Sequence, residues 1–151
     1  MAIDFDNSPS VLLTVLTNRM NLNATRELRE AADVSITEWA VLAVAAAEPG
    51  APPQRVIDVS ALDKSVVSRA IKALAARRLI EVRAHPSHRR KTTLHLTAAG
   101  RATHDICRRI QHAGDRRMLE GLKPFEVAQA LELFRHLTRQ INDLLMEEKV
   151  P

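Results

Sequence analysis

The sequence predicts a mainly α-helical protein with one small β-hairpin. Two observations lead to this fold class. Along most of the 151-residue chain, apolar residues recur at intervals of three and four, which is the spacing of an amphipathic helix. The exception is the stretch from residue 79 to residue 96, where two short runs, LIEVR and TTLHL, flank a cationic segment. Apolar and polar residues alternate in the second run, as in a half-buried strand, so the two runs predict a hairpin.

Four helices are expected ahead of the hairpin. The first spans about Pro9 to Ala31 and begins with a Ser-Pro pair, a favourable N-cap and first helical residue. Ser35 and Glu38 match a capping box and open an almost wholly apolar helix, WAVLAVAAAE, which we expect to be buried on all sides. Beyond the rigid connector PGAPP, the segments QRVIDVSAL and KSVVSRAIKALAARR predict two helices with a tight joint between them, and Asp63 caps the second.

Two further helices are expected after the hairpin. Thr97 caps the first of them, and Pro124 opens the second. In that last helix a heptad seam with one polar break is formed by Val127, Leu131, Phe134, Thr138, Ile141 and Leu145. Such a seam needs a partner, which is either the protein's own core or a second copy of the chain. The apolar stripe of the first helix favours the second copy.

The positive charge is concentrated in the middle third of the chain. Residues 51–100 hold ten Lys or Arg against three Asp or Glu, whereas residues 1–50 carry a net charge of −4 and residues 101–151 a net charge of +1, for a total of +4. A basic segment in an otherwise near-neutral chain favours a localised contact with a polyanion. The alternative is a solvated basic face that keeps the protein soluble.

Other features argue against several classes of protein. No run approaches the roughly 18 apolar residues of a membrane span, and the acidic start MAIDFDNSPS lacks the pattern of a secretory signal. We therefore expect a cytoplasmic protein without a membrane partner. The sequence contains no phosphate-binding glycine loop, nucleophile elbow or metal motif, so we expect neither enzymatic activity nor catalytic residues.

The order of helix, tight joint, helix and hairpin is that of a winged helix-turn-helix, whose second helix enters the major groove of DNA. In that helix the expected buried stripe consists of Val67, Ala70, Ile71 and Leu74. The opposite face carries short hydroxyls and cations, which are Lys64, Ser65, Ser68, Arg69 and Lys72. The serines allow close approach to base edges, Arg69 can bond a guanine with two hydrogen bonds, and the lysines can neutralise phosphates.

The segment between the two strands, HPSHRRKTT, is the expected wing tip. It carries Arg89, Arg90 and Lys91, and an arginine at that place can enter the adjacent minor groove. A solvated loop is one alternative. A metal site is another, with possible ligands His85, His88, His95 and Cys107. Three neighbouring cations disfavour a divalent ion, so we expect no metal and no cofactor.

Taken together, the motifs of residues 34–100 resemble the MarR family of transcriptional regulators. VSITEWAVL is similar to the family's second helix, and LDKSVVSRAIKAL with RRLIEVR resembles its recognition helix and first wing strand. HPSHRRKTTLHLTAAG resembles the wing, which usually reads Asp-Pro-x-Asp-Arg-Arg and closes with Leu-Thr-x-x-Gly. His85 and His88 stand in place of these aspartates, the second of which commonly orients the arginine that corresponds to Arg90. Arg78 stands where most members carry a glycine.

The resemblance implies a winged helix-turn-helix over residues 35–100, flanked by an N-terminal dimerisation helix in residues 1–34 and by C-terminal helices in residues 101–151 that complete the dimerisation region. It also implies a homodimer that binds a pseudo-palindromic operator in double-stranded DNA. Family members usually repress transcription and are released by a small effector, often an aromatic carboxylate or a phenol. Trp39 is the candidate for the effector pocket, with plain core packing as its alternative.

Two other functions remain open at this point. Cys107 is the single cysteine, and a thiol-responsive regulator of the same fold would need it exposed and with a lowered pKa. A helical interaction module without DNA binding is the second alternative, and it predicts no salt-dependent binding to duplex DNA. The sequence fixes neither the effector, nor the operator, nor the choice between repression and activation.

Overall fold

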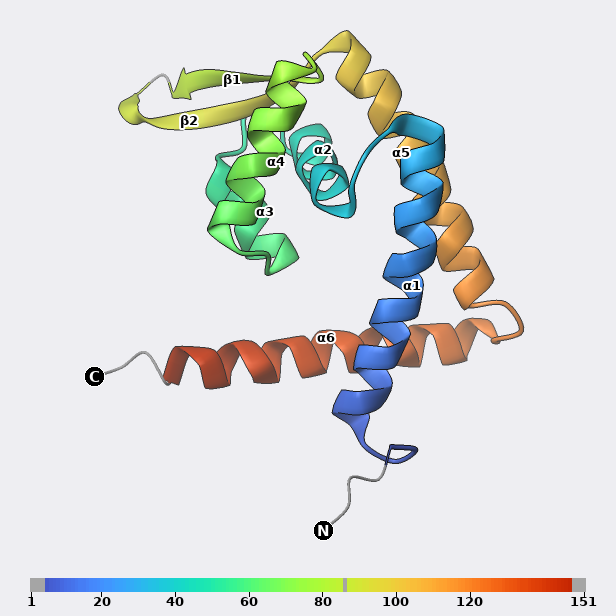
Figure 1. Cartoon of the computed structure of the whole chain (residues 1–151). Coiled ribbons are helices and arrows are strands. Elements are labelled where there is room, and N and C mark those ends of the chain that lie inside the picture. The colour runs from blue at the N-terminus through green and yellow to red at the C-terminus, as the bar shows by residue number, and fades with distance from the viewer. Residues whose placement is uncertain (1–4, 86, 148–151) are drawn as a thin grey trace. The chain divides into compact units, whose positions relative to one another are not determined.

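The computed structural model describes residues 5–85 and 87–147 (Figure 1). Its elements follow in this order: α1 (Pro9–Ala32), α2 (Ile36–Ala47), α3 (Pro53–Ser60), α4 (Lys64–Ala76), β1 (Ile80–His85), β2 (His88–Leu96), α5 (Ala98–Met118) and α6 (Pro124–Glu147). A mostly helical chain with one antiparallel hairpin confirms the predicted fold class. The chain forms two compact units, residues 1–114 and 115–151, which are described separately. The division of roles at residues 34 and 100 stays a prediction.

Helix α2 is the centre of the first unit. It packs against α1, α3, α4 and β2, and its side chains Val41, Leu42 and Ala45 are buried. Both hydrogen bonds of the capping box are present: the Glu38 N–H donates to Ser35 Oγ over 3.2 Å, and the Ser35 N–H donates to Glu38 Oε2 over 2.8 Å. The predicted capping box is confirmed, and α2 is buried or half-buried as far as Ala46 instead of being enclosed on all sides.

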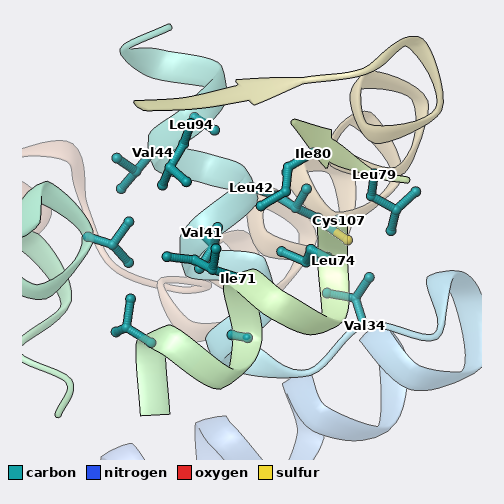
Figure 2. Close-up of a cluster of buried hydrophobic side chains, with 14 of the residues drawn as sticks. Val34, Val41, Leu42, Val44, Ile71, Leu74, Leu79, Ile80, Leu94 and Cys107 are labelled. Atoms are coloured by element: carbon teal, nitrogen blue, oxygen red, sulfur yellow. The ribbon is translucent and has the colours of Figure 1, made fainter. Parts of the chain in front are cut away.

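One apolar cluster holds the first unit together (Figure 2). Its fully enclosed members come from α2, α3, α4, β2, the first half of α5 and the short segment before α2. Burial of each leucine or valine stabilises the fold by about 1.5–3 kcal/mol. Cys107 of α5 lies inside this cluster with no exposed surface, and burial raises the pKa of its thiol. A sensor thiol needs the opposite of both properties. The structure therefore does not support the thiol-responsive alternative.

The hairpin is attached to the end of α2 by backbone hydrogen bonds. Strand β1 pairs antiparallel with β2, with Val82 opposite Leu94. On the other edge of β2, the Gly50 N–H donates to the Leu94 carbonyl over 3.0 Å, and the Leu94 N–H donates to the Ala51 carbonyl over 2.9 Å. The connector PGAPP thus pairs with the free edge of β2 and fixes the base of the wing.

The strands extend further than the sequence predicts. β1 continues to His85 and β2 begins at His88, with a register shift between Ala84 and His85. Arg89, Arg90 and Lys91 therefore belong to β2 and not to a loop at the tip. The pairing is regular as far as Ala84 opposite Thr92 and resumes with His85 opposite His88, so these three cations fall in the irregular part of the ladder. Apolar alternation does not predict such an irregularity.

The end of α4 contains a left-handed residue that is not glycine. Arg78 has a φ of 57°, a conformation that costs a non-glycine residue roughly 1 kcal/mol. The Leu79 N–H donates to the Leu74 carbonyl and the Arg78 N–H donates to the Ala75 carbonyl, each over 2.9 Å. This is the Schellman pattern that ends many helices. Arginine in place of the family's glycine therefore does not prevent the Schellman ending of α4.

The start of α5 is pressed against the start of β1. Thr97 Oγ1 accepts from the Gly100 N–H over 2.9 Å and donates to the Arg78 carbonyl over 2.7 Å. A Cβ atom on Gly100 would lie 1.8 Å from the Leu79 carbonyl oxygen. Two residues of the motif LTAAG thus have structural roles. Its threonine caps α5, as predicted, and its glycine permits the close approach of two backbones.

The two long terminal helices leave much of their apolar surface uncovered. In α1, which belongs to the first unit, the exposed apolar side chains are Leu12, Leu13, Val15, Leu16, Met20 and Leu22. In α6, which belongs to the second unit, they are Phe125, Leu131, Leu133, Phe134, Ile141, Leu144 and Leu145. Most of the predicted seam is therefore open to solvent in a single chain. None of the helices in the described segments combines the length and apolar character needed to cross a bilayer.

Candidate nucleic-acid interface

The helix α4 begins at a well-defined cap. Asp63 Oδ1 accepts from the Ser65 N–H over 2.7 Å, as predicted for the capping residue. Hydrogen bonds from the Ser65 hydroxyl and backbone, and the nearby charge of Arg69, hold the pKa of Asp63 below its usual value. The carboxylate therefore stays ionised at neutral pH and complements the positive end of the helix dipole. This fixes the position of the first turn, which carries Lys64 and Ser65.

The two faces of α4 divide as the sequence predicts. The inner stripe is buried and consists of Val67, Ala70, Ile71 and Leu74. The five predicted contact residues are all exposed, namely Lys64, Ser65, Ser68, Arg69 and Lys72. The structure therefore places these five side chains together on the solvent side of one helix. Their contacts with DNA stay a prediction.

The wing contributes further cations. Lys91 is exposed on β2. The side chains of Arg89 and Arg90 lie outside the described part of the chain. Only the backbone of β2 places these two residues, and their contacts with DNA stay a prediction. Arg83 is a wing cation that the sequence analysis did not assign, and its Nη2 donates to Glu81 Oε2 over 2.6 Å on the same strand. This exposed pair contributes little stability.

His85 takes over a structural role at the wing turn. Its Nδ1 accepts from the Ser87 N–H over 3.2 Å, the hydrogen bond that an aspartate in this place forms in an Asx-turn. The rings of His85 and His88 lie with their centroids 5.0 Å apart. Among the residues that the structure describes, no three His, Cys, Asp or Glu side chains gather closely enough to hold a metal ion.

A groove that the sequence analysis missed lies between α3, α4 and the hairpin. It has a volume of about 370 Å³. Its lining is mostly apolar and includes Pro53, Ile57, Val67, Ile71, Ala75 and Val82. Lys64, Ser68 and Lys72 also line it. The sequence offered one signal for this groove, because Val82 is an apolar residue between the charged residues Glu81 and Arg83. In the structure Val82 is exposed.

Trp39 lies at the junction of α2 and α5. Its ring centroid is 5.4 Å from that of His104, and its Nε1 donates to Gln111 Oε1 over 3.4 Å. The side chain is half-buried and packs against the apolar cluster. One part of the indole therefore packs in the core, and another part contacts the polar side chains of α5. Its role toward an effector stays a prediction.

A capped helix with a polar and cationic outer face, joined to a paired wing with further cations, is the architecture of a winged helix-turn-helix. Residues 32–91 match the model of the MarR family. The resemblance seen in the sequence is therefore confirmed over this segment, which is similar to MarR-family domains. Comparison with curated protein sequences gave no match.

Solved structures show that the whole chain has the fold of MarR-type regulators. A MarR/EmrR family transcriptional regulator from Acinetobacter sp. ADP1 has a TM-score of 0.86 at 23% identity, over 93% of this chain and 99% of that one. BpsR of Bordetella bronchiseptica, whose DNA binding is regulated by 6-hydroxynicotinic acid, has a TM-score of 0.81 at 22% identity, over 91% and 98%. FabT of Streptococcus pneumoniae, solved in complex with DNA, has a TM-score of 0.73 at 24% identity, over 88% and 94%.

Proposed function

We propose that the chain is a homodimeric, sequence-specific DNA-binding regulator of transcription. The observation that carries this proposal is the outer face of α4, where two serines and three cations are all exposed beside a cationic wing. The solved complex of FabT with DNA supports the same use of this fold. In this reading α4 enters the major groove, and the wing follows the adjacent minor groove.

The dimer is supported by the uncovered apolar surfaces of α1 and α6. Solitary exposed apolar side chains are ordinary, but contiguous rows of them on two long helices mark an interaction surface. The heptad spacing on α6 fits a second helix of the same kind. A two-fold dimer would present two copies of α4 to half-sites roughly 34 Å apart, so the operator is expected to be pseudo-palindromic.

A small aromatic acid or phenol is the effector class that we propose, and its binding would release the operator. BpsR supports this class, because 6-hydroxynicotinic acid regulates its binding to DNA. Trp39 and His104 provide aromatic surface at the α2–α5 junction, and Gln111 provides a polar group there. A ligand that favours one spacing of the two recognition helices changes DNA affinity by the coupling energy, typically about 1–3 kcal/mol. Repression is the mode expected from such release.

Replacement of Arg69 by alanine should relax sequence preference at one base pair of each half-site. A bidentate contact to guanine contributes about 1–3 kcal/mol of discrimination, which the variant loses. The measurement is a fluorescence titration of each protein with the operator and with a scrambled duplex. Arg26→Ala removes a comparable exposed cation from α1 and should leave the discrimination intact. If wild type and the Arg69 variant discriminate equally between operator and scrambled duplex, Arg69 does not recognise a base.

Replacement of Arg90 by alanine should weaken binding to every duplex by a similar factor. The loss of one phosphate contact lowers the slope of log affinity against log salt by about 0.9. The slope is measured by repeating the titration between low and moderate salt. An unchanged slope in the variant would remove Arg90 from the interface.

The proposal as a whole is tested by selecting bound duplexes from random DNA with the pure protein. The expected result is a pair of inverted half-sites about one helical turn apart. If the protein enriches no sequence and shows no salt-dependent affinity for any duplex, the remaining reading is a helical interaction module.

A further inference from the structure

Three helix ends meet at the side chain of Arg77. Arg77 is the C-cap residue of α4, and its guanidinium reaches the end of α1, which lies 44 residues earlier in the chain. There Nη1 donates to the Asp33 carbonyl over 2.8 Å, and Nη2 donates to the Ala32 carbonyl over 3.4 Å. The start of α2 supplies the third partner, because Glu38 Oε1 lies 3.6 Å from Nη1.

The two carboxylates near Arg77 differ in what they contribute. Glu38 is only 6% exposed, and its other oxygen is held by the Ser35 N–H of the capping box. A buried carboxylate without its cation is strongly unfavourable, so this pair resists separation. Asp33 Oδ2 is also 3.6 Å from Arg77, but that side chain is 77% exposed and contributes little. Apart from Glu38, the contacts that matter are therefore the two backbone carbonyls.

The chemistry of these contacts requires an arginine. The last carbonyls of a helix carry the negative end of its dipole, and a cation placed there is stabilised. A guanidinium has five donors in a rigid planar fork, so it can serve two carbonyls and a carboxylate at once, whereas the ammonium of lysine cannot match this geometry. Arg77 thus caps α1 from a distant part of the chain.

The position of Arg77 is itself fixed by the end of α4. The preceding Leu74 is fully buried, and the following Arg78 is held in the left-handed conformation of the Schellman pattern. Helices α1 and α4 both pack on α2. The Arg77 contacts close the third side of this triangle, so any tilt of α4 relative to α1 must break them.

We propose that Arg77 is a positioning residue that fixes the angle between α1 and the recognition helix α4. The inference rests on the proposed function, in which α1 belongs to the dimer interface and α4 reads DNA. In such a dimer this angle sets the distance between the two recognition helices. Arg77 therefore determines how strictly the protein discriminates between operators with different spacing, without touching DNA itself.

The test measures discrimination of spacing. The duplex selected by the wild-type protein is compared with a version that carries two extra base pairs at its centre, which rotate one half-site by roughly 70°. Glu38→Gln keeps the capping acceptor and removes the buried charge, so it serves as the background. On it, Arg77→Met keeps side-chain length and removes every donor. A single half-site duplex checks that the recognition face is intact, and thermal unfolding checks the fold.

Wild type and Glu38→Gln should strongly prefer the selected spacing. The double variant should bind the single half-site as they do, while its preference for the selected spacing falls by about 5- to 150-fold, the range of an ordinary coupling between sites. Arg77→Lys in the otherwise native chain should show an intermediate loss, and it replaces the double variant if that protein does not unfold cooperatively. A folded variant with the wild-type preference overturns the role of Arg77. Failure of the wild type to bind any duplex overturns the proposed function instead.

Discussion

Replacement of Phe134 and Ile141 by aspartate should lower affinity for a complete operator by about 10²- to 10⁴-fold, because a dimer gains this factor from binding two linked half-sites. Both side chains belong to the heptad seam of α6 and are exposed in the single chain, by 39% and 56%. Charges there are compatible with a folded monomer. In a paired seam they would be buried without partners, which is strongly unfavourable.

The loss of dimer is measured by sedimentation, and affinity by titration with the operator and with one half-site. Gln129→Asp with Gln140→Asp is the matched control, because it adds the same charge to α6 at exposed positions outside the seam. The control should sediment as a dimer and bind as wild type does. A seam variant that still sediments as a dimer would show that α6 does not provide the interface.

Replacement of Gly100 by alanine should destabilise the protein by about 3 kcal/mol or more, at the upper end of what overpacking costs. The added Cβ would meet the Leu79 carbonyl oxygen at 1.8 Å. Because that oxygen belongs to the backbone between α4 and β1, neither partner can give way without moving the root of the wing. For a domain of this size the loss corresponds to roughly 6–12 °C in Tm.

The matched control for this change is Gly114→Ala. Gly114 is also a glycine of α5, and a Cβ there would have no neighbour within 4 Å. Alanine is about 1 kcal/mol more favourable than glycine within a helix, so this variant should be slightly stabilised. Thermal unfolding of both variants measures the difference. Similar Tm values would mean that α5 does not press on the Leu79 backbone as described.

The elements predicted from local patterns agree with the structure. Caps and apolar periodicity act within a few residues, so Asp63, Thr97 and the buried stripe of α4 could be read directly from the sequence. The sequence showed only that Arg78 stands where most members of the family carry a glycine, and the structure adds that it takes the left-handed conformation, with a φ of 57°. The placement of Arg89 to Lys91 at a loop tip was wrong, because these residues belong to β2, where its pairing with β1 is irregular.

The features that the sequence did not predict depend on contacts between distant parts of the chain. Arg77 follows an apolar helix and looks like any surface cation, and its partners at the end of α1 are identified only by folding. The groove under the wing likewise combines α3, α4 and both strands. Periodicity reports which face of an element is buried, but it does not report which other element covers that face.

The burial of Cys107 gives the chain a built-in reporter of its own opening. It is the single cysteine of the sequence, it has no exposed surface, and burial disfavours the thiolate that alkylating reagents attack. An alkylating reagent therefore reaches the sulfur only when α5 separates from the cluster around α2 and α4. The rate of alkylation then reports how often that separation occurs. Stabilisation by operator or effector can therefore be measured as a decrease in the rate of Cys107 alkylation, with no label added to the protein.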